Sequence, residues 1–195
     1  MGIINHSHAL LLIDIQNKVI DFKSITRPSE TEIAFNKFLE RISKLQTWAR
    51  DSDLATIHVQ HDGGKGSRIE RDSQGWQIRN EIDVQPKDPI FYKTHCSSFS
   101  GTGLNDYLKK NKIDSLIIAG CMTNFCIDTT CRIAIEKGYN VILAADGHMT
   151  CDNDGLTFEQ IIKHHNSILA DLSADNACIK VVPVNKIISL TVSAD

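Results

Sequence analysis

Three side chains that could cooperate in covalent catalysis, Asp14, Lys93 and Cys126, each stand at or just beyond the end of a short apolar run. A thiol can attack a carbonyl carbon, and a carboxylate can take the thiol proton and return it to a leaving amine. An ammonium can stabilise the negative charge that develops. These residue types therefore match the hydrolysis of an acyl compound, provided that the fold brings them together.

The segment GCMTNFCIDTT predicts a helix whose first turn contains Cys126. Thr123 or Asn124 could cap that helix, and the positive helix end with a nearby Lys93 ammonium would lower the pKa of the thiol. Backbone N–H groups of Met122 and Cys126 could stabilise the oxyanion of a tetrahedral intermediate. The plainer interpretation is that the cysteine is a small buried hydrophobe, and that the carboxylate and ammonium are ordinary turn-capping and surface groups.

Short apolar runs predict buried strands at 9–15, 54–59, 89–93, 115–119 and 141–145, with a sixth at 178–182. Helical periodicity between them predicts helices at 31–50, 103–111, 124–137 and 157–171. Strands that are apolar throughout and alternate with helices predict a mostly parallel sheet covered on both faces. We expect one domain over residues 1–195, a three-layer α/β/α fold with a six-stranded, Rossmann-like sheet.

The predicted sheet also indicates where a ligand would bind. In open parallel sheets, ligands bind beyond the carboxyl ends of the strands. Asp14, Lys93 and Cys126 all fall on that edge. If they were a buried hydrophobe, a turn cap and a surface charge, their shared position would be a coincidence. The segment 62–87 leaves the same edge and has little periodicity, so it is either a functional lid or a decorative excursion.

The composition excludes several classes of function. The chain has 195 residues, 42% of them hydrophobic and 23% charged, and its formal net charge of -3 gives no electrostatic reason to expect nucleic acid. The apolar runs are too short to cross a bilayer, and no secretory signal precedes them, so we expect a cytoplasmic protein with no membrane partner. Six cysteines without a CxxC pair fit neither a disulfide framework nor a zinc site.

Five segments together resemble the isochorismatase-like cysteine hydrolases, a family that includes nicotinamidases and N-carbamoylsarcosine amidases. They are LLIDIQN, VQHDGG, FYKTHCSSFSGTGL, AGCMTNFCIDTTCRIA and GYNVILAADGHMT. The resemblance implies a six-stranded parallel sheet, a catalytic triad of Asp14, Lys93 and Cys126, and a dimer or tetramer. It also implies a cis peptide between Cys121 and Met122, which would place the Met122 N–H in the oxyanion hole.

Departures from better-known relatives narrow the expected substrate. True isochorismatases lack a thiol nucleophile, so Cys126 favours a small amide, carbamoyl or related acyl compound, cleaved through a thioacyl intermediate. Nicotinamidases hold a metal with an Asp and histidines after the second strand, an arrangement that VQHDGGKGS does not supply. His58 and His61 should face opposite sides of a strand. We therefore expect neither metal nor cofactor.

Several other side chains are candidate substrate contacts or rival partners. His95 beside Cys96 could form a conventional Cys–His pair, but no third orienting group is evident. The main rival function is a binding or regulatory protein that keeps the fold without chemistry. A second rival is thiol redox sensing by Cys126, with Cys96, Cys121 or Cys151 as the resolving thiol. The candidate substrate contacts are Gln16, His61, Trp76, Phe99, Thr123 and Phe125.

Overall fold

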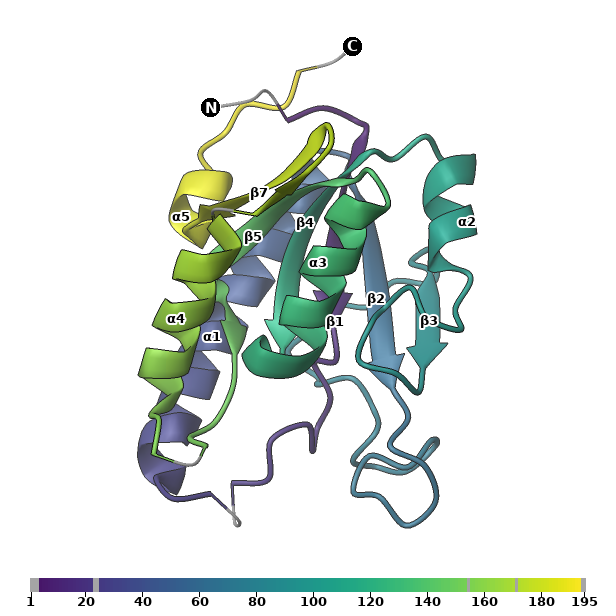
Figure 1. Ribbon diagram of the computed structural model, residues 1–195. Coiled ribbons are helices and arrows are strands. Elements are labelled where there is room, and N and C mark those ends of the chain that lie inside the picture. The colour runs from purple at the N-terminus through teal and green to yellow at the C-terminus, as the bar shows by residue number, and fades with distance from the viewer. Residues whose placement is uncertain (1–3, 23–24, 154, 171, 194–195) are drawn as a thin grey trace.

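A computed structural model describes residues 4–22, 25–153, 155–170 and 172–193, and at its centre is one sheet in the order β3-β2-β1-β4-β5-β7-β6 (Figure 1). All pairs are parallel except β6 with β7. The predicted six-stranded parallel sheet is therefore confirmed, with a short seventh strand added at one edge. The strands are β1 His8–Ile13, β2 Ala55–His61, β3 Ile90–Lys93, β4 Ser115–Cys121, β5 Asn140–Met149, β6 Ser173–Ala174 and β7 Ala177–Val182.

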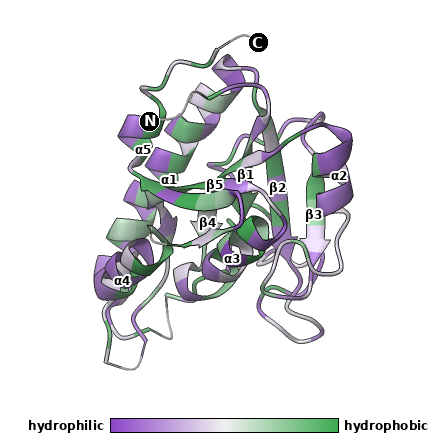
Figure 2. Cartoon of the chain, turned by 45° about the horizontal axis from the view of Figure 1, so that its top comes forward, coloured by the Kyte–Doolittle hydropathy of each residue, from purple (hydrophilic) through white to green (hydrophobic). Residues whose placement is uncertain are grey.

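Helices cover both faces of the sheet, as the three-layer prediction requires, and Figure 2 shows the hydrophobic strands enclosed between them. Apolar side chains of α1 and α5 pack on one face, and those of α2 and α3 pack on the other. The predicted helix at 157–171 corresponds to α4, and Asp171 lies outside the described residues. The helices are α1 Pro28–Asp51, α2 Leu104–Lys110, the π-helical turn η1 Thr123–Ile127, α3 Asp128–Glu136, α4 Phe158–Ala170 and α5 Val184–Ile187. In the part of the chain that the structure describes, no helix is long and apolar enough to span a membrane.

The longest helix, α1, shows why the sequence forms these layers. Pro28 begins it, where the missing N–H of proline costs no intrahelical hydrogen bond. Phe35, Phe38, Ile42 and Leu45 recur at helical spacing and are all buried against the sheet. Burial of this stripe fixes the helix across one face of the sheet.

The central strands approach each other closely where β1 and β4 end. A Cβ on Gly120 would lie 2.0 Å from the carbonyl oxygen of Ile13, and the φ of Gly120 is +133°, so only glycine fits there. Asp14 follows directly, with a φ of 52° in the left-handed region that aspartate tolerates. The N–H of Asp14 donates to the carbonyl oxygen of Val59 at 2.9 Å. The chain therefore turns sharply after β1 and leaves Asp14 at the carboxyl edge.

The segment 62–87, between β2 and β3, packs against the residues that follow β1. Gln16 and Ile78 form an antiparallel bridge, and the N–H of Lys18 donates to the carbonyl oxygen of Gly75 at 3.0 Å. The guanidinium of Arg68 donates to the carbonyl oxygen of Lys18 at 2.8 Å. These bonds anchor the segment as a wall beside the carboxyl edge, and its opening as a lid stays a prediction.

Candidate active site

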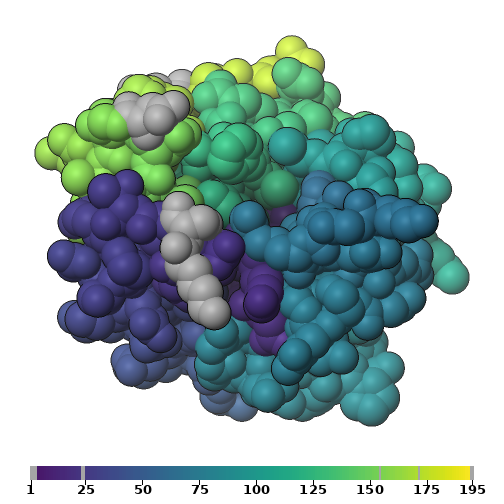
Figure 3. Space-filling view, turned by 90° about the horizontal axis from the view of Figure 1, so that it is seen from below, coloured from purple at the N-terminus to yellow at the C-terminus, as the bar shows by residue number. Residues whose placement is uncertain are grey.

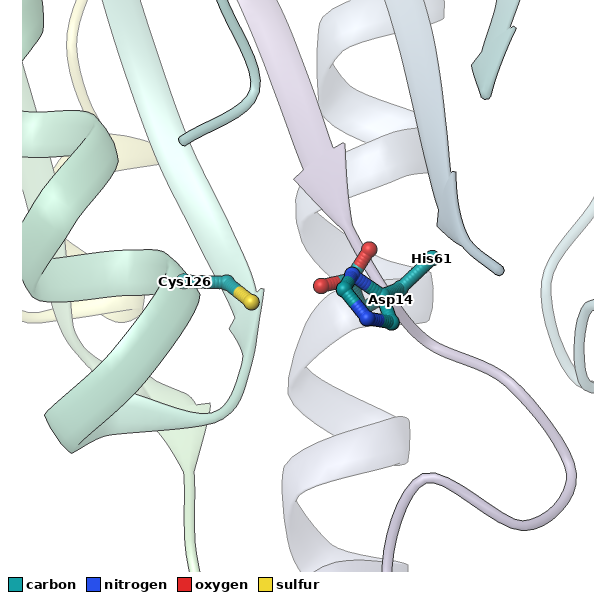
Figure 4. A group of neighbouring side chains, drawn as sticks. All are labelled: Asp14, His61 and Cys126. Atoms are coloured by element: carbon teal, nitrogen blue, oxygen red, sulfur yellow. The ribbon is translucent and has the colours of Figure 1, made fainter. Parts of the chain in front are cut away.

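The ammonium of Lys93 joins Asp14 and Cys126 beyond the ends of β1, β3 and β4. Its Nζ donates to Asp14 Oδ2 at 2.7 Å and to Cys126 Sγ at 3.0 Å. It also donates to the carbonyl oxygen of His95 at 3.2 Å and lies 3.1 Å from His61 Nδ1. Figure 4 shows the Cys126 sulfur pointing toward the Asp14 carboxylate, with the His61 ring beside it. The structure thus brings the three predicted residues together.

Burial sets the protonation of this group. Burial raises the pKa of Asp14, although the Lys93 charge opposes that shift. Burial also raises the pKa of the Cys126 thiol, the Asp14 charge adds to the increase, and Lys93 only partly offsets it. Burial disfavours the charge on Lys93, but the charges and hydrogen bonds of Asp14 and Cys126 together more than compensate, so the pKa of Lys93 is raised. The prediction of a lowered thiol pKa is therefore wrong, and the sulfur rests as a neutral thiol.

The thiol has a proton acceptor within the same group. Asp14 is 1% exposed, and its Oδ1 has no hydrogen-bond partner among the described residues, while Oδ2 is bound to Lys93. A carboxylate whose pKa is raised is a stronger base than one in water. Asp14 is therefore suited to accept a proton from Cys126.

The turn that carries Cys126 differs from the predicted one. It is a single π-helical turn, η1, whose N-cap is Met122, with no side-chain capping hydrogen bond. The predicted cap by Thr123 or Asn124 is wrong, because their side chains bond elsewhere: Thr123 Oγ1 lies 2.9 Å from His148 Nδ1, and Asn124 Oδ1 accepts from Thr150. Thr123 is fully buried, so its hydroxyl faces protein rather than an open pocket.

The peptide bond between Cys121 and Met122 is cis, which confirms what the resemblance implies. Among the described residues, the N–H of Met122 donates to no other backbone group. This donor and the N–H of Cys126 are the two predicted for the oxyanion hole, and that role stays a prediction.

Two candidate substrate contacts support the framework of the site instead of lining it openly. Gln16 is fully buried, and its Nε2 donates to the carbonyl oxygens of His61 at 3.0 Å and Trp76 at 2.7 Å. Its Oε1 accepts from the N–H of His61 at 2.9 Å. Trp76 is 9% exposed and packs on Tyr92, with ring centroids 5.3 Å apart. Both residues tie the long segment to the end of β2.

The two phenylalanines lie in different environments. Phe99 is buried and stacks on Tyr139 in the core cluster that also contains Cys126. Phe125 is 47% exposed and directly precedes Cys126 in the chain. Of these two rings, Phe125 is therefore the one that a bound molecule could reach.

The surface at this edge is hollowed, as Figure 3 shows from the side of the strand ends. The hollow lies between the blue segment that follows β2 and the green segment that follows β4, with purple N-terminal residues at its floor. A small molecule could therefore approach the strand ends from this side.

Sequence reasoning missed the contact between Lys93 and the backbone of His95. The acceptor is a carbonyl oxygen, which every residue has, so no residue type signals it. The His95 side chain itself is exposed.

One group of potential metal ligands coincides with this site. Ligand atoms of Asp14, His61 and Cys126 lie within 4.8 Å of one another. However, the Lys93 ammonium lies within 3.1 Å of an atom of each, so a metal cation there would meet a positive charge. His58 is directed elsewhere, with its Nε2 3.4 Å from Asp88. The donor set does not fit a metal while Lys93 is charged, and the absence of a metal stays a prediction.

Comparisons with known proteins show the family of the chain. A family model described as the isochorismatase domain matches residues 8–165. A streptothricin hydrolase of Streptomyces noursei is 28% identical over 144 residues, which cover 74% of this chain and 50% of that protein, so the chain spans about half the length of this relative. Nicotinamidase 3 of Arabidopsis thaliana is 32% identical over 158 residues, which cover 75% of each chain.

A solved structure of an isochorismatase family protein superposes with a TM-score of 0.77 and 32% sequence identity, covering 90% of this chain and 98% of that one. The family model covers most of the chain, and both relatives named above are hydrolases. On these grounds, the chain belongs to the isochorismatase family.

Proposed function

We propose that the chain is a cysteine hydrolase that cleaves a small amide, carbamoyl or related acyl compound. The observation that carries the proposal is the Lys93 ammonium, 2.7 Å from Asp14 Oδ2 and 3.0 Å from Cys126 Sγ. A buried carboxylate, ammonium and thiol in mutual contact supply a base, a charge stabiliser and a nucleophile. Relatives named as a streptothricin hydrolase and a nicotinamidase support an amide-like substrate.

In the first half-reaction, Asp14 takes the thiol proton while Cys126 Sγ attacks the carbonyl carbon. The carbonyl oxygen becomes an oxyanion, which the N–H groups of Met122 and Cys126 stabilise. Lys93 stabilises the negative charge shared by Asp14 and the sulfur. Asp14 then gives its proton to the leaving nitrogen, the C–N bond breaks, and the acyl group stays on Cys126 as a thioester.

In the second half-reaction, water replaces the amine. Asp14 takes a proton from the water, whose oxygen attacks the thioester carbon. The second tetrahedral intermediate collapses, the C–S bond breaks, and the proton returns from Asp14 to the Cys126 sulfur. The products are a carboxylic acid and an amine, and no step requires a metal or an organic cofactor.

The raised thiol pKa decides how this nucleophile is activated. A free thiolate would attack alkylating reagents at mildly acidic pH, whereas a neutral thiol beside a base reacts when the base takes its proton. Activity should therefore depend on Asp14 as strongly as on Cys126. This coupling distinguishes the mechanism from that of an exposed, permanently ionised cysteine.

The experiment is a screen of small amides and carbamoyl compounds, measuring released amine or ammonia, followed by acid quenching and intact-protein mass spectrometry. We expect an acyl adduct on Cys126, and loss of at least about a thousand-fold in turnover for Cys126→Ala, Asp14→Asn and Lys93→Met. The matched control is Cys178→Ser, a half-buried cysteine on β7 that has no contact with Lys93.

Two outcomes would replace the proposal. If a compound bound tightly at the site but no amine was released and no adduct formed, the chain would be a binding or regulatory protein. If mild oxidation instead produced a defined, reversible disulfide between Cys126 and Cys96, Cys121 or Cys151, redox sensing would become the better function.

A further inference from the structure

The turn that presents Cys126 is not held by its own side chains. The η1 turn, Thr123–Ile127, has no side-chain cap, and its first two residues instead bond to the end of β5. Thr123 Oγ1 lies 2.9 Å from His148 Nδ1, and Thr150 Oγ1 donates to Asn124 Oδ1 at 2.7 Å. Support for the proposed nucleophile therefore comes from a different strand.

A register shift in β5 makes these contacts possible. Ile118 on β4 pairs with Leu143, but Gly120 pairs with His148, so β5 advances five residues where β4 advances two. The chain folds tightly inside this shift: a Cβ on Gly147 would lie 2.6 Å from that of Ala144. Beyond the shift, His148 and Thr150 are alternate residues and project to the same side, toward η1.

The hydrogen bonds around His148 determine where its proton lies. Asn166 of α4 donates through Nδ2 to the carbonyl oxygen of Ala145 at 2.8 Å, so its Oδ1 is the atom that faces His148 Nε2, also at 2.8 Å. Nε2 must then carry the proton and Nδ1 must be the acceptor. Burial lowers the pKa of His148 to about 4, which keeps the ring neutral. The Thr123 hydroxyl therefore donates to Nδ1.

Within the described chain, the side chains of His148, Thr123 and Thr150 contact neither the open side of the site nor its charged groups. His148 is 2% exposed, and Thr123 and Thr150 are fully buried, so none of the three side chains reaches an approaching substrate. None of them contacts Asp14 or Lys93 through a hydrogen bond among the described residues. Their direct effect is on the backbone position of the turn.

We propose that His148 and Thr150 are positioning residues that hold the η1 turn so that the Cys126 sulfur stays against the Lys93 ammonium. The proposal rests on the proposed function, in which Cys126 is the nucleophile. Loss of either bond leaves a buried polar atom unpaired and frees one end of the turn. A sulfur that moves away from Lys93 loses the 3.0 Å hydrogen bond from the ammonium, and catalytic geometry tolerates little displacement.

The test replaces Thr123 by Val, which keeps the shape of the side chain and removes its hydroxyl, and by Ser, which keeps the hydroxyl. The matched control is Thr130→Val. Thr130 is also fully buried and bonds to Ser98 through its hydroxyl, but it lies on α3 and does not contact β5 through that group. All variants are compared with the native protein in melting temperature, in hydrogen exchange of the peptide containing η1, and in the pH profile of Cys126 alkylation by iodoacetamide.

We expect Thr123→Val to speed exchange in the η1 peptide, to shift the pH profile of Cys126 alkylation away from that of the native protein, and to change the alkylation rate at a fixed pH by about tenfold or more. Thr123→Ser should remain close to the native protein in hydrogen exchange of the η1 peptide and in Cys126 alkylation. Thr130→Val should lower the melting temperature without changing that exchange or the alkylation profile. Should Thr123→Val fail to fold, Thr150→Val removes the second bond and is expected to act in the same direction.

If Thr123→Val and Thr150→Val exchanged hydrogen and were alkylated as the native protein is, the proposal would be overturned. It would also be overturned if Thr130→Val changed exchange and alkylation as much as Thr123→Val does. Faster exchange with an unchanged alkylation profile would also overturn it, because the bonds would then stabilise the turn without placing the sulfur. Failure of the proposed function appears separately, in the native protein. If Lys93→Met left Cys126 alkylation unchanged, Cys126 would not be activated, and exchange alone would decide whether β5 holds the turn.

Discussion

Lowering the pH should weaken the fold through His148, and the structure gives the size of the effect. Burial lowers the pKa of this imidazole from 6.5 to about 4, with Asn166 and Asp146 opposing the shift and His165 adding to it. An unfolded chain binds a proton at this residue below its ordinary pKa, whereas the folded chain does not. Stability from this residue is therefore present at neutral pH and is lost as pH falls from about 6.5 to about 4.

A difference of about 2.5 pKa units between the unfolded and folded states corresponds to roughly 3 kcal/mol in total. About 2 kcal/mol of it should be lost between pH 7 and about pH 5, where the unfolded chain is protonated and the folded one is not. This is a large fraction of the net stability of a typical domain, about 5–15 kcal/mol.

The assay is urea unfolding at a series of pH values for the native protein, His148→Gln and His164→Gln. His164 is an exposed histidine on α4, so its replacement controls for the loss of a histidine side chain outside the core. Carboxylates that titrate in the same range do so in all three proteins, and only the difference between them reports on His148. His148→Gln should have a shallower pH dependence, whatever its absolute stability.

Parallel pH curves for the native protein and His148→Gln would refute the reasoning. If His148→Gln does not fold, a proton NMR titration of His148 in the native protein tests the same reasoning. A His148 that titrates near 6.5 would show that its Nδ1 is not reserved for Thr123, and the assigned proton positions would be wrong.

Three further predictions concern two substitutions and the addition of zinc. Gly120→Ala should abolish soluble expression, because its Cβ would lie 2.0 Å from the Ile13 carbonyl oxygen; native-like circular dichroism of this variant would contradict the close approach. Ile42→Ala should lower the free energy of unfolding by about 2–5 kcal/mol in urea titrations, since the side chain is fully buried in the core. Zinc added to chelator-treated protein should inhibit turnover or leave it unchanged, because the Lys93 ammonium lies among the possible ligands; activation by zinc would show that Lys93 can move away.

The central strands and the edge that carries the candidate site could be predicted from the sequence, because burial of a strand on both faces leaves a continuous apolar run. The runs before Asp14 and Cys126 form the buried strands β1 and β4, whereas the run before Lys93 forms the edge strand β3, which is only partly buried. Parallel pairing then places the ends of all three strands together. The seventh strand, Ser173–Ala174, could not be predicted this way, since two residues have no periodicity. Short edge strands are decided by tertiary contacts.

The electrostatics of the site could not be predicted from residue types. The helix-end argument for a thiolate at Cys126 treats the thiol as exposed, but the sulfur is buried beside a carboxylate, and desolvation outweighs the Lys93 charge. The cap assigned to Thr123 failed for a related reason. Its competitor, His148, is brought near only by the register shift in β5, and nothing in the local sequence of the turn reports it.

The dependence of η1 on β5 also bears on how the protein is made. Thr123 and Asn124 meet their partners 25 and 26 residues later in the chain, so the turn leaves the ribosome well before the residues that hold it. At synthesis rates of about 5–20 residues per second, that interval is roughly one to five seconds. A nascent chain therefore carries Cys126 on a turn without these two hydrogen bonds, which can form only after His148 and Thr150 have reached the sheet.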